Sequence, residues 1–173
     1  MDIITTSLME AFLKCRTKCY LRAREEVETG NAYATWFRTQ SDAFRSEGVK
    51  RLAAGVAPDR CAAAGVSAMT IGRSAQWVLA TDFVARSENL QCSCHAVERH
   101  PSAGGGQAAQ FIPIRFVFTN KLTPDDKLLL AFDALVISKV LSREVALGRI
   151  VYGDSHATVN VKTSAPPAIV LVF

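Results

Sequence analysis

Residues 111–140 read FIPIRFVFTNKLTPDDKLLLAFDALVISKV, and they join a predicted strand to the clearest helix of the chain. The alternating pattern of residues 111–118 predicts the strand. Thr123 can cap the helix, Pro124 suits its first position, and two carboxylates then oppose the positive end of the helix dipole. The apolar face that follows recurs at helical spacing, at Leu128, Leu129, Phe132, Leu135, Val136 and Val140. A strand followed by an amphipathic helix predicts an α/β fold.

Two more helices are predicted on the N-terminal side of this stretch. Ser7 and Glu10 have the spacing of a capping box. An apolar stripe continues from that start, at Leu8, Phe12, Cys15 and Cys19. Residues 32–54 predict a second helix that Gly55 ends. Its buried stripe is expected at Tyr33, Phe37, Phe44 and Leu52.

Strand patterns account for much of the remaining chain. Four segments have them: 76–85, 90–99, 148–152 and 157–162. Residues 87–89 predict the turn of a hairpin, and the glycines of 101–107 predict a loop. The order helix, helix, three strands, helix, two strands predicts a mixed β-sheet flanked by helices.

Composition favours a single domain over residues 1–173. The chain has 173 residues, 49% of them hydrophobic, which is enough for one sizeable core. It contains neither a signal pattern nor an apolar run of the roughly 20 residues that span a bilayer. Five cysteines, an odd number, favour free thiols or metal ligands in a cytoplasmic protein, with no membrane contact. The net charge of +4 permits nucleic-acid binding without requiring it.

Several motifs, in this order, resemble the RecB-like branch of the PD-(D/E)XK nuclease superfamily, which includes the CRISPR-adaptation exonucleases. Phe12-x-x-Cys15 followed by Tyr20-Leu21 is similar to that family's N-terminal signature. Three later segments resemble its catalytic strand entry, the following helix and the next strand: 111–114, 127–135 and 148–152. The resemblance spans residues 5–163. It implies a restriction-endonuclease-like core, DNA as the substrate and Mg²⁺-dependent phosphodiester hydrolysis.

The resemblance departs from the family at the metal site. There, a carboxylate on one strand and a Glu/Asp-x-Lys pair on the next hold Mg²⁺ and a water. The pair corresponds here to Arg115 and Val117, and an arginine cannot ligate Mg²⁺ but can hold a phosphate. The family's Gln-x-x-x-Tyr corresponds to Leu128 and Phe132. No histidine lies near Gly48, where many relatives place a metal ligand.

Glu98 is the leading candidate for a metal-binding carboxylate. Strand alternation puts it on the apolar side of residues 90–99, close to the strand's end. It would either ligate a metal or form a structural salt bridge with Arg115. An active enzyme would use Glu98 and Asp82 as catalytic metal ligands, with Lys127 replacing the missing lysine. Otherwise Lys127 is a solvated helix residue.

The cysteines give the resemblance a second departure. In many relatives the first cysteine, here Cys15, joins three C-terminal cysteines around a [4Fe–4S] cluster. That trio is missing and residues 164–173 form an atypical tail, so the resemblance implies a C-terminally truncated member with an incomplete ligand set. A cluster would otherwise need the remaining cysteines, Cys19, Cys61, Cys92 and Cys94. The Cys92-x-Cys94 spacing on a strand favours buried, inert thiols.

A basic run on the first helix includes Arg16 and Lys18. It can follow a phosphate backbone or form a solvated helix face. Two functional hypotheses follow. One is a RecB-like DNA nuclease, and the other is a catalytically silent relative that binds DNA, a partner nuclease or a helicase through Arg115 and this helix.

Overall fold

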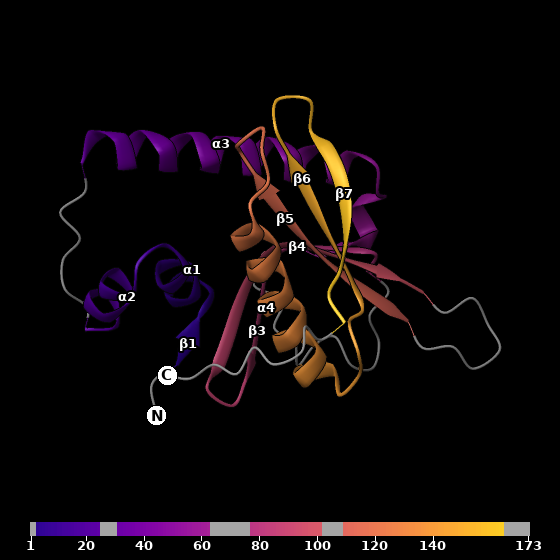
Figure 1. Cartoon of the computed structure of the whole chain (residues 1–173). Coiled ribbons are helices and arrows are strands. Elements are labelled where there is room, and N and C mark those ends of the chain that lie inside the picture. The colour runs from indigo at the N-terminus through magenta and orange to yellow at the C-terminus, as the bar shows by residue number, and fades with distance from the viewer. Residues whose placement is uncertain (1–2, 25–30, 63–76, 102–108, 165–173) are drawn as a thin grey trace.

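The computed structural model describes residues 3–24, 31–62, 77–101 and 109–164, and a mixed seven-stranded sheet forms its centre (Figure 1). The strands are β1 (Ile4–Thr5), β2 (Cys61–Ala62), β3 (Leu79–Ser87), β4 (Leu90–His100), β5 (Gln110–Val117), β6 (Leu147–Tyr152) and β7 (Ala157–Lys162). They lie in the order β2-β3-β4-β5-β6-β7, and β1 pairs with β4. The β1–β4, β2–β3 and β5–β6 pairs are parallel, and the other pairs are antiparallel. The predicted mixed sheet flanked by helices is confirmed.

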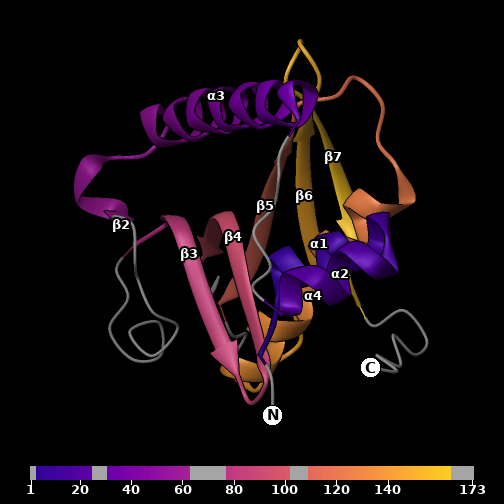
Figure 2. The same cartoon turned by 90° about the vertical axis from the view of Figure 1, so that its left-hand side faces the viewer.

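Helices cover both faces of the sheet (Figures 1 and 2). They are α1 (Thr6–Lys14), α2 (Arg16–Ala23), α3 (Ala32–Ala54) and α4 (Pro124–Leu141), with a short 3₁₀ helix η1 (Pro58–Arg60). The larger core lies between the sheet and α4, with Phe83, Phe132 and Ile137 buried in it. A smaller core lies under α3, where Phe44 packs on Ile114 and Phe116. The predicted loop at 101–107 and tail at 164–173 lie almost wholly outside the described residues.

Helix α4 begins as the sequence predicts. The Thr123 hydroxyl accepts a hydrogen bond from the backbone N–H of Asp126, and the Asp126 carboxylate accepts one from the backbone N–H of Thr123. This reciprocal capping box satisfies two donors that the helix start leaves without partners. The helix forms the crossover between the parallel strands β5 and β6, so its position fixes the order of the sheet's second half.

The prediction for the first helix is wrong in two respects. Thr5 caps α1, with its hydroxyl accepting from the backbone N–H of Leu8, so the predicted capping box of Ser7 and Glu10 does not form. The helix also breaks at Cys15, whose backbone is extended and whose side chain is exposed. The predicted stripe through Cys15 is therefore interrupted, because the break turns α2 onto a new axis.

Helix α3 has the predicted bounds, and its predicted stripe is borne out in part, because Phe44 and Leu52 are half-buried against the core under α3. Its only buried residue is Gly48. Tyr33 is 69% exposed, so it does not join the core. The N-terminal part of α3 extends beyond the sheet (Figure 1), and Tyr33 and Trp36 of this part are exposed.

The β3–β4 hairpin departs from strict strand alternation. Its residues are therefore divided differently between the larger core under α4 (the α4 core) and the smaller core under α3 (the α3 core). Ala80 and Phe83 both face the α4 core, although they are three positions apart, where strict alternation would put them on opposite faces. Between them, Asp82 has a φ of 48°, a left-handed conformation that twists the strand. On β4 the same shift separates Cys94, in the α4 core, from Ala96, in the α3 core.

This shift corrects the predicted environment of Glu98. Glu98 pairs with Leu79 on one side and Ile112 on the other, and Leu79 belongs to the α3 core. Glu98 therefore lies on the α3 face of the sheet, not on the face of Cys92 and Cys94. Arg115 lies on the opposite face, because it is one position from Ile114, which belongs to the α3 core.

Candidate functional site

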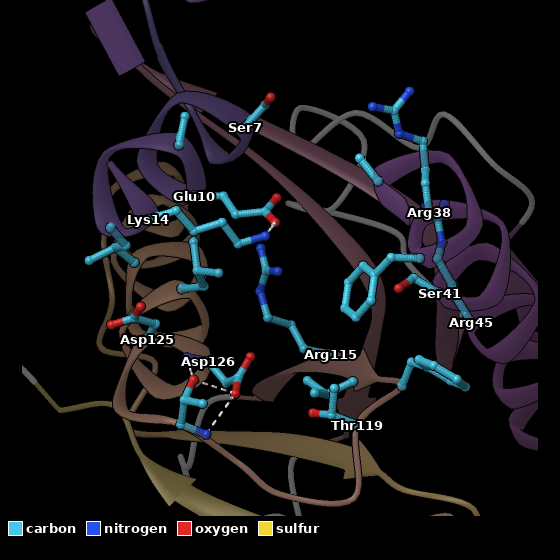
Figure 3. Close-up of a pocket in the computed structure, with 18 of the residues that line it drawn as sticks. Ser7, Glu10, Lys14, Arg38, Ser41, Arg45, Arg115, Thr119, Asp125 and Asp126 are labelled. Atoms are coloured by element: carbon cyan, nitrogen blue, oxygen red, sulfur yellow. Dashed lines mark hydrogen bonds and ion pairs between the residues drawn. The ribbon is translucent and has the colours of Figure 1, made fainter. Parts of the chain in front are cut away.

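A cleft of about 970 Å³ opens between the α1–α2 pair and the first half of α3 (Figure 3). The end of β5 and the start of α4 close its floor. Figure 3 shows Arg115 rising from this floor, with Glu10 and Lys14 of α1 on one side and Arg38 and Arg45 of α3 on the other.

The cleft exists because β4 and β5 separate. Their pairing runs from His100 and Gln110 to Ala96 and Ile114, after which β5 continues beside β6. At the point of separation, the backbone N–H of Phe116 donates to Nδ1 of His95 at 3.0 Å, where the next ladder bond would be expected. A side chain thus bridges the opening between two strands.

His95 is held neutral by its surroundings. Burial lowers the pKa of His95 well below its ordinary value, and the positive charges of Arg115 and Arg45 lower it further. The hydrogen bond from Phe116 requires an unprotonated Nδ1, which agrees with this direction.

Arg115 forms the central ion pair of the floor. Its Nε and Nη2 donate to the Asp133 carboxylate of α4 at 2.6 Å and 3.3 Å. The Asp133 side chain is 0% exposed, and its Oδ1 also accepts from the Thr6 hydroxyl at 3.2 Å. Burial alone would lower the pKa of Arg115, but Asp133 outweighs it and raises that pKa, so the guanidinium stays charged. No hydrogen bond joins Nη1 of Arg115 to another described residue.

More cationic side chains than carboxylates line the cleft. Six cationic side chains line it: Lys14, Lys18, Arg22, Arg38, Arg45 and Arg115. Four carboxylates line it: Glu10, Asp42, Asp125 and Asp126. Burial alone would raise the pKa of Glu10, but Lys14, Arg115 and Arg22 outweigh it and lower that pKa. Arg45 and Arg115 also pair with Asp82 and Asp133, which lie outside the lining, so the cleft offers cationic groups to an anionic ligand without a large excess of charge.

Exposed aromatic side chains lie at the α3 side of the cleft. Tyr33, which lines it, is 69% exposed, and the neighbouring Trp36 is 51% exposed. Their ring centroids are 5.9 Å apart, and the Trp36 ring meets the edge of Phe118 at 6.2 Å. Large exposed rings that other rings hold in place offer flat surfaces for stacking.

The predicted metal-binding carboxylates do not come together. Glu98 accepts from Arg149 at 2.7 Å and contacts His100 at 3.3 Å, so its partner is not Arg115 as predicted. Asp82 pairs with Arg45 of α3. Neither carboxylate lines the cleft, and Lys127 is an exposed residue of α4 that does not line it either.

The predicted phosphate-binding residues divide into two groups. Arg115 and Lys18 line the cleft. Arg16 does not line it; its guanidinium lies over the Phe12 ring, 5.7 Å from the centroid. Arg16 and Lys18 both belong to α2, and two positions along a helix lie about 200° apart around its axis, so these two side chains point to opposite sides.

An aromatic ring fills the place where the resemblance implies a metal-ligating histidine. A Cβ added to Gly48 would overlap the Phe116 ring. That ring also stacks on His95, with centroids 6.0 Å apart and planes 7° apart, and meets the edge of Phe44. The rings of Phe116, Phe44 and His95 therefore pack together beside Gly48.

The described residues fit neither of the cofactors that the resemblance implies. Across the described ranges, one group of three possible ligands lies close enough to share an ion, formed by Cys92, Cys94 and Asp133. Mg²⁺ prefers an all-oxygen shell, which this group does not provide. Cys15 is exposed, whereas Cys92 and Cys94 are buried in the core under α4, so these three do not surround one [4Fe–4S] cluster.

Sequence reasoning missed two residues of this site. Asp133 is the only charged residue within positions 128–138, an otherwise almost wholly apolar stretch, and that isolation could have marked it as the partner of a buried cation. The role of His95 had no such signal, because it depends on the separation of two strands.

No protein-family model matches the chain, and no curated protein matches it. Among the described residues, no helix combines the length and the hydrophobicity that crossing a membrane requires.

Proposed function

We propose that this chain binds single-stranded DNA in the cleft between α1–α2 and α3 and does not hydrolyse it, as a catalytically silent relative of RecB-like nucleases with a restriction-endonuclease-like core. One observation carries the proposal: the cationic cleft has at its floor an arginine held by a buried carboxylate. This arrangement provides phosphate contacts without metal ligands.

The charges explain affinity for a nucleic-acid backbone. Each phosphate that a lysine or arginine neutralises releases condensed counterions, which favours binding at low salt. Arg115 is oriented in advance by Asp133, so little side-chain entropy is lost when its guanidinium contacts a phosphate.

The aromatic rings favour a single strand over a duplex. Tyr33 and Trp36 can stack only on bases whose faces are accessible, and a duplex hides those faces. Cationic grooves with aromatic platforms beside them are typical of proteins that bind single strands without sequence preference.

The alternative of a Mg²⁺-dependent nuclease has less support. It requires Glu98 and Asp82 to share a metal with a lysine nearby. Each carboxylate instead pairs with a different arginine, and Lys127 lies outside the cleft. Its distinguishing result is metal-dependent cleavage that Glu98→Ala abolishes.

Binding is tested with a fluorescent oligo(dT) at several salt concentrations. The wild type should bind at low salt, and Lys18→Gln and Arg38→Gln should each reduce the slope of log K against log salt by about 0.7. Tyr33→Ala should weaken binding roughly tenfold, in the range for one stacked base. Lys127→Gln is the matched control and should behave as the wild type.

Two outcomes would overturn the proposal. The first is no binding at low salt, or equal losses in the Lys127→Gln control and the cleft variants. The second is cleavage of the oligonucleotide in Mg²⁺ or Mn²⁺ that disappears in Glu98→Ala, which would establish the nuclease instead.

A further inference from the structure

Two thiols and a carboxylate meet in the core on the α4 side of the sheet. The Sγ atoms of Cys92 and Cys94 are 3.9 Å apart. With an oxygen of Asp133, all three potential ligand atoms lie within 4.8 Å of one another. The three residues are 0%, 2% and 0% exposed, in the same order.

The spacing of the two sulfurs suits one tetrahedral ion. Residues i and i+2 of a strand point to the same face, so β4 presents both thiols to α4. Two thiolates that bind one Zn²⁺ with Zn–S bonds of about 2.3 Å lie about 3.8 Å apart in a tetrahedral site. The sulfurs therefore need almost no movement, and only the carboxylate has to approach.

The surrounding charges also suit a divalent cation. Two thiolates, one carboxylate and a divalent ion together carry one negative charge, which Arg115 beside them neutralises. The Thr6 hydroxyl and Arg115 both donate to Asp133, and such contacts orient a carboxylate ligand. A buried ion would thus leave no net charge in the core.

We infer that Cys92, Cys94 and Asp133 form a buried structural site for a thiophilic divalent cation of the Zn²⁺ type. On binding, the two S–H bonds break, their protons pass to water, and two metal–sulfur bonds form. The site shares Arg115 and Asp133 with the floor of the cleft, but its test measures bound metal and does not depend on whether the cleft binds DNA.

Burial, the neighbouring Cys92 thiol and the Asp133 charge raise the pKa of Cys94 in the metal-free protein. The protonated thiols are therefore stable in the closed core. The ion has to enter while the chain folds, and the experiment must provide it then.

In the test, the full reduced chain is refolded with one equivalent of Zn²⁺. Free metal is then removed by gel filtration, and the zinc that remains bound to the protein is measured. The wild type should retain about one ion per chain and gain a higher Tm than the chain refolded in chelator. Cys92→Ala and Cys94→Ala should lose the ion, whereas Cys61→Ala, the matched control, should retain it. Circular dichroism confirms that each variant is folded.

Co²⁺ gives a second readout that does not depend on variants. Refolding with Co²⁺ should produce the near-ultraviolet absorption of thiolate–cobalt bonds and tetrahedral visible bands. Substoichiometric zinc in the wild type, absence of these bands, or equal zinc in Cys92→Ala and the wild type would each overturn the inference.

Discussion

His95 combines a structural role with a fixed protonation state. Its Nδ1 accepts the backbone hydrogen bond that β5 cannot make to β4, and its ring lies against Phe116. A protonated ring would lose this bond and place a charge in a buried space beside Arg115 and Arg45. Acidification should therefore act on the junction of the two strands.

The residue-scale prediction concerns stability below about pH 6.5. Because the folded pKa of His95 is depressed well below 6.5, the unfolded chain binds the proton first. Stability is then fully present above pH 6.5 and falls as the pH drops, by up to about 1.4 kcal/mol per pH unit from this one group. Urea unfolding at several pH values measures the slope.

The variant His95→Gln should be less stable at neutral pH but should lose most of this pH dependence. His100→Gln is the matched control, because His100 is exposed and should leave the slope unchanged. An equally steep slope in His95→Gln would assign the effect to other groups.

At the scale of the elements, α3 approaches β5 most closely at Gly48. Because Gly48 has no side chain, the Phe116 ring can lie against the backbone of α3. The Phe44 ring packs edge-to-face on the same Phe116 ring. The smaller core therefore depends on one position without a Cβ in a long helix.

The contact between Gly48 and Phe116 is tested with a double-mutant cycle. Gly48→Ala should destabilise the protein by about 1–3 kcal/mol, because the added methyl overlaps the ring and outweighs alanine's better helix propensity. In a Phe116→Leu background the same change should cost much less. Urea unfolding gives the coupling energy.

Gly55→Ala is the control for this cycle. A Cβ there would meet only the Leu52 carbonyl oxygen, at 3.5 Å, which is an ordinary contact. Additive effects of Gly48→Ala and Phe116→Leu would contradict the close approach.

The elements also show how far the sequence predicts this molecule. Thr123 and Pro124 mark the start of α4 through local chemistry, and Gly55 ends α3 as expected. The break at Cys15 and the left-handed Asp82 carry no comparable signal, because tertiary contacts select them. The first divides the predicted N-terminal helix into α1 and α2, and the second puts Glu98 on the α3 face.

Arg115, which the sequence analysis expected to hold a phosphate, lines the cleft, and its role there stays a prediction. Its partner, Asp133, was not anticipated. Such pairings depend on strand order and helix packing. They cannot be predicted from the spacing of residues along the chain.

At the scale of the whole molecule, the two faces of the sheet differ in how firmly they are covered. Helix α4 buries seven of its residues, whereas α3, which is longer, buries only Gly48. Burial of apolar area is the main source of stability, so α3 should be the weaker layer.

Native-state hydrogen exchange tests this difference. Amides of α3 should exchange through a partial opening at a lower free energy than amides of α4, β4 and β5, which should require global unfolding. Denaturant dependence separates the two classes. Equal free energies of opening for α3 and α4 would show that the layers unfold together.

The packing of Phe116 over Gly48 also constrains how sequences of this type can change. A chain with this pair cannot gain a histidine at position 48 in one step, because any side chain there meets the ring. Position 116 must first become smaller, which opens the core and lowers stability before the second change can bring any benefit. The two substitutions therefore have a fixed order, and the intermediate with the smaller residue at position 116 is less stable than the starting chain.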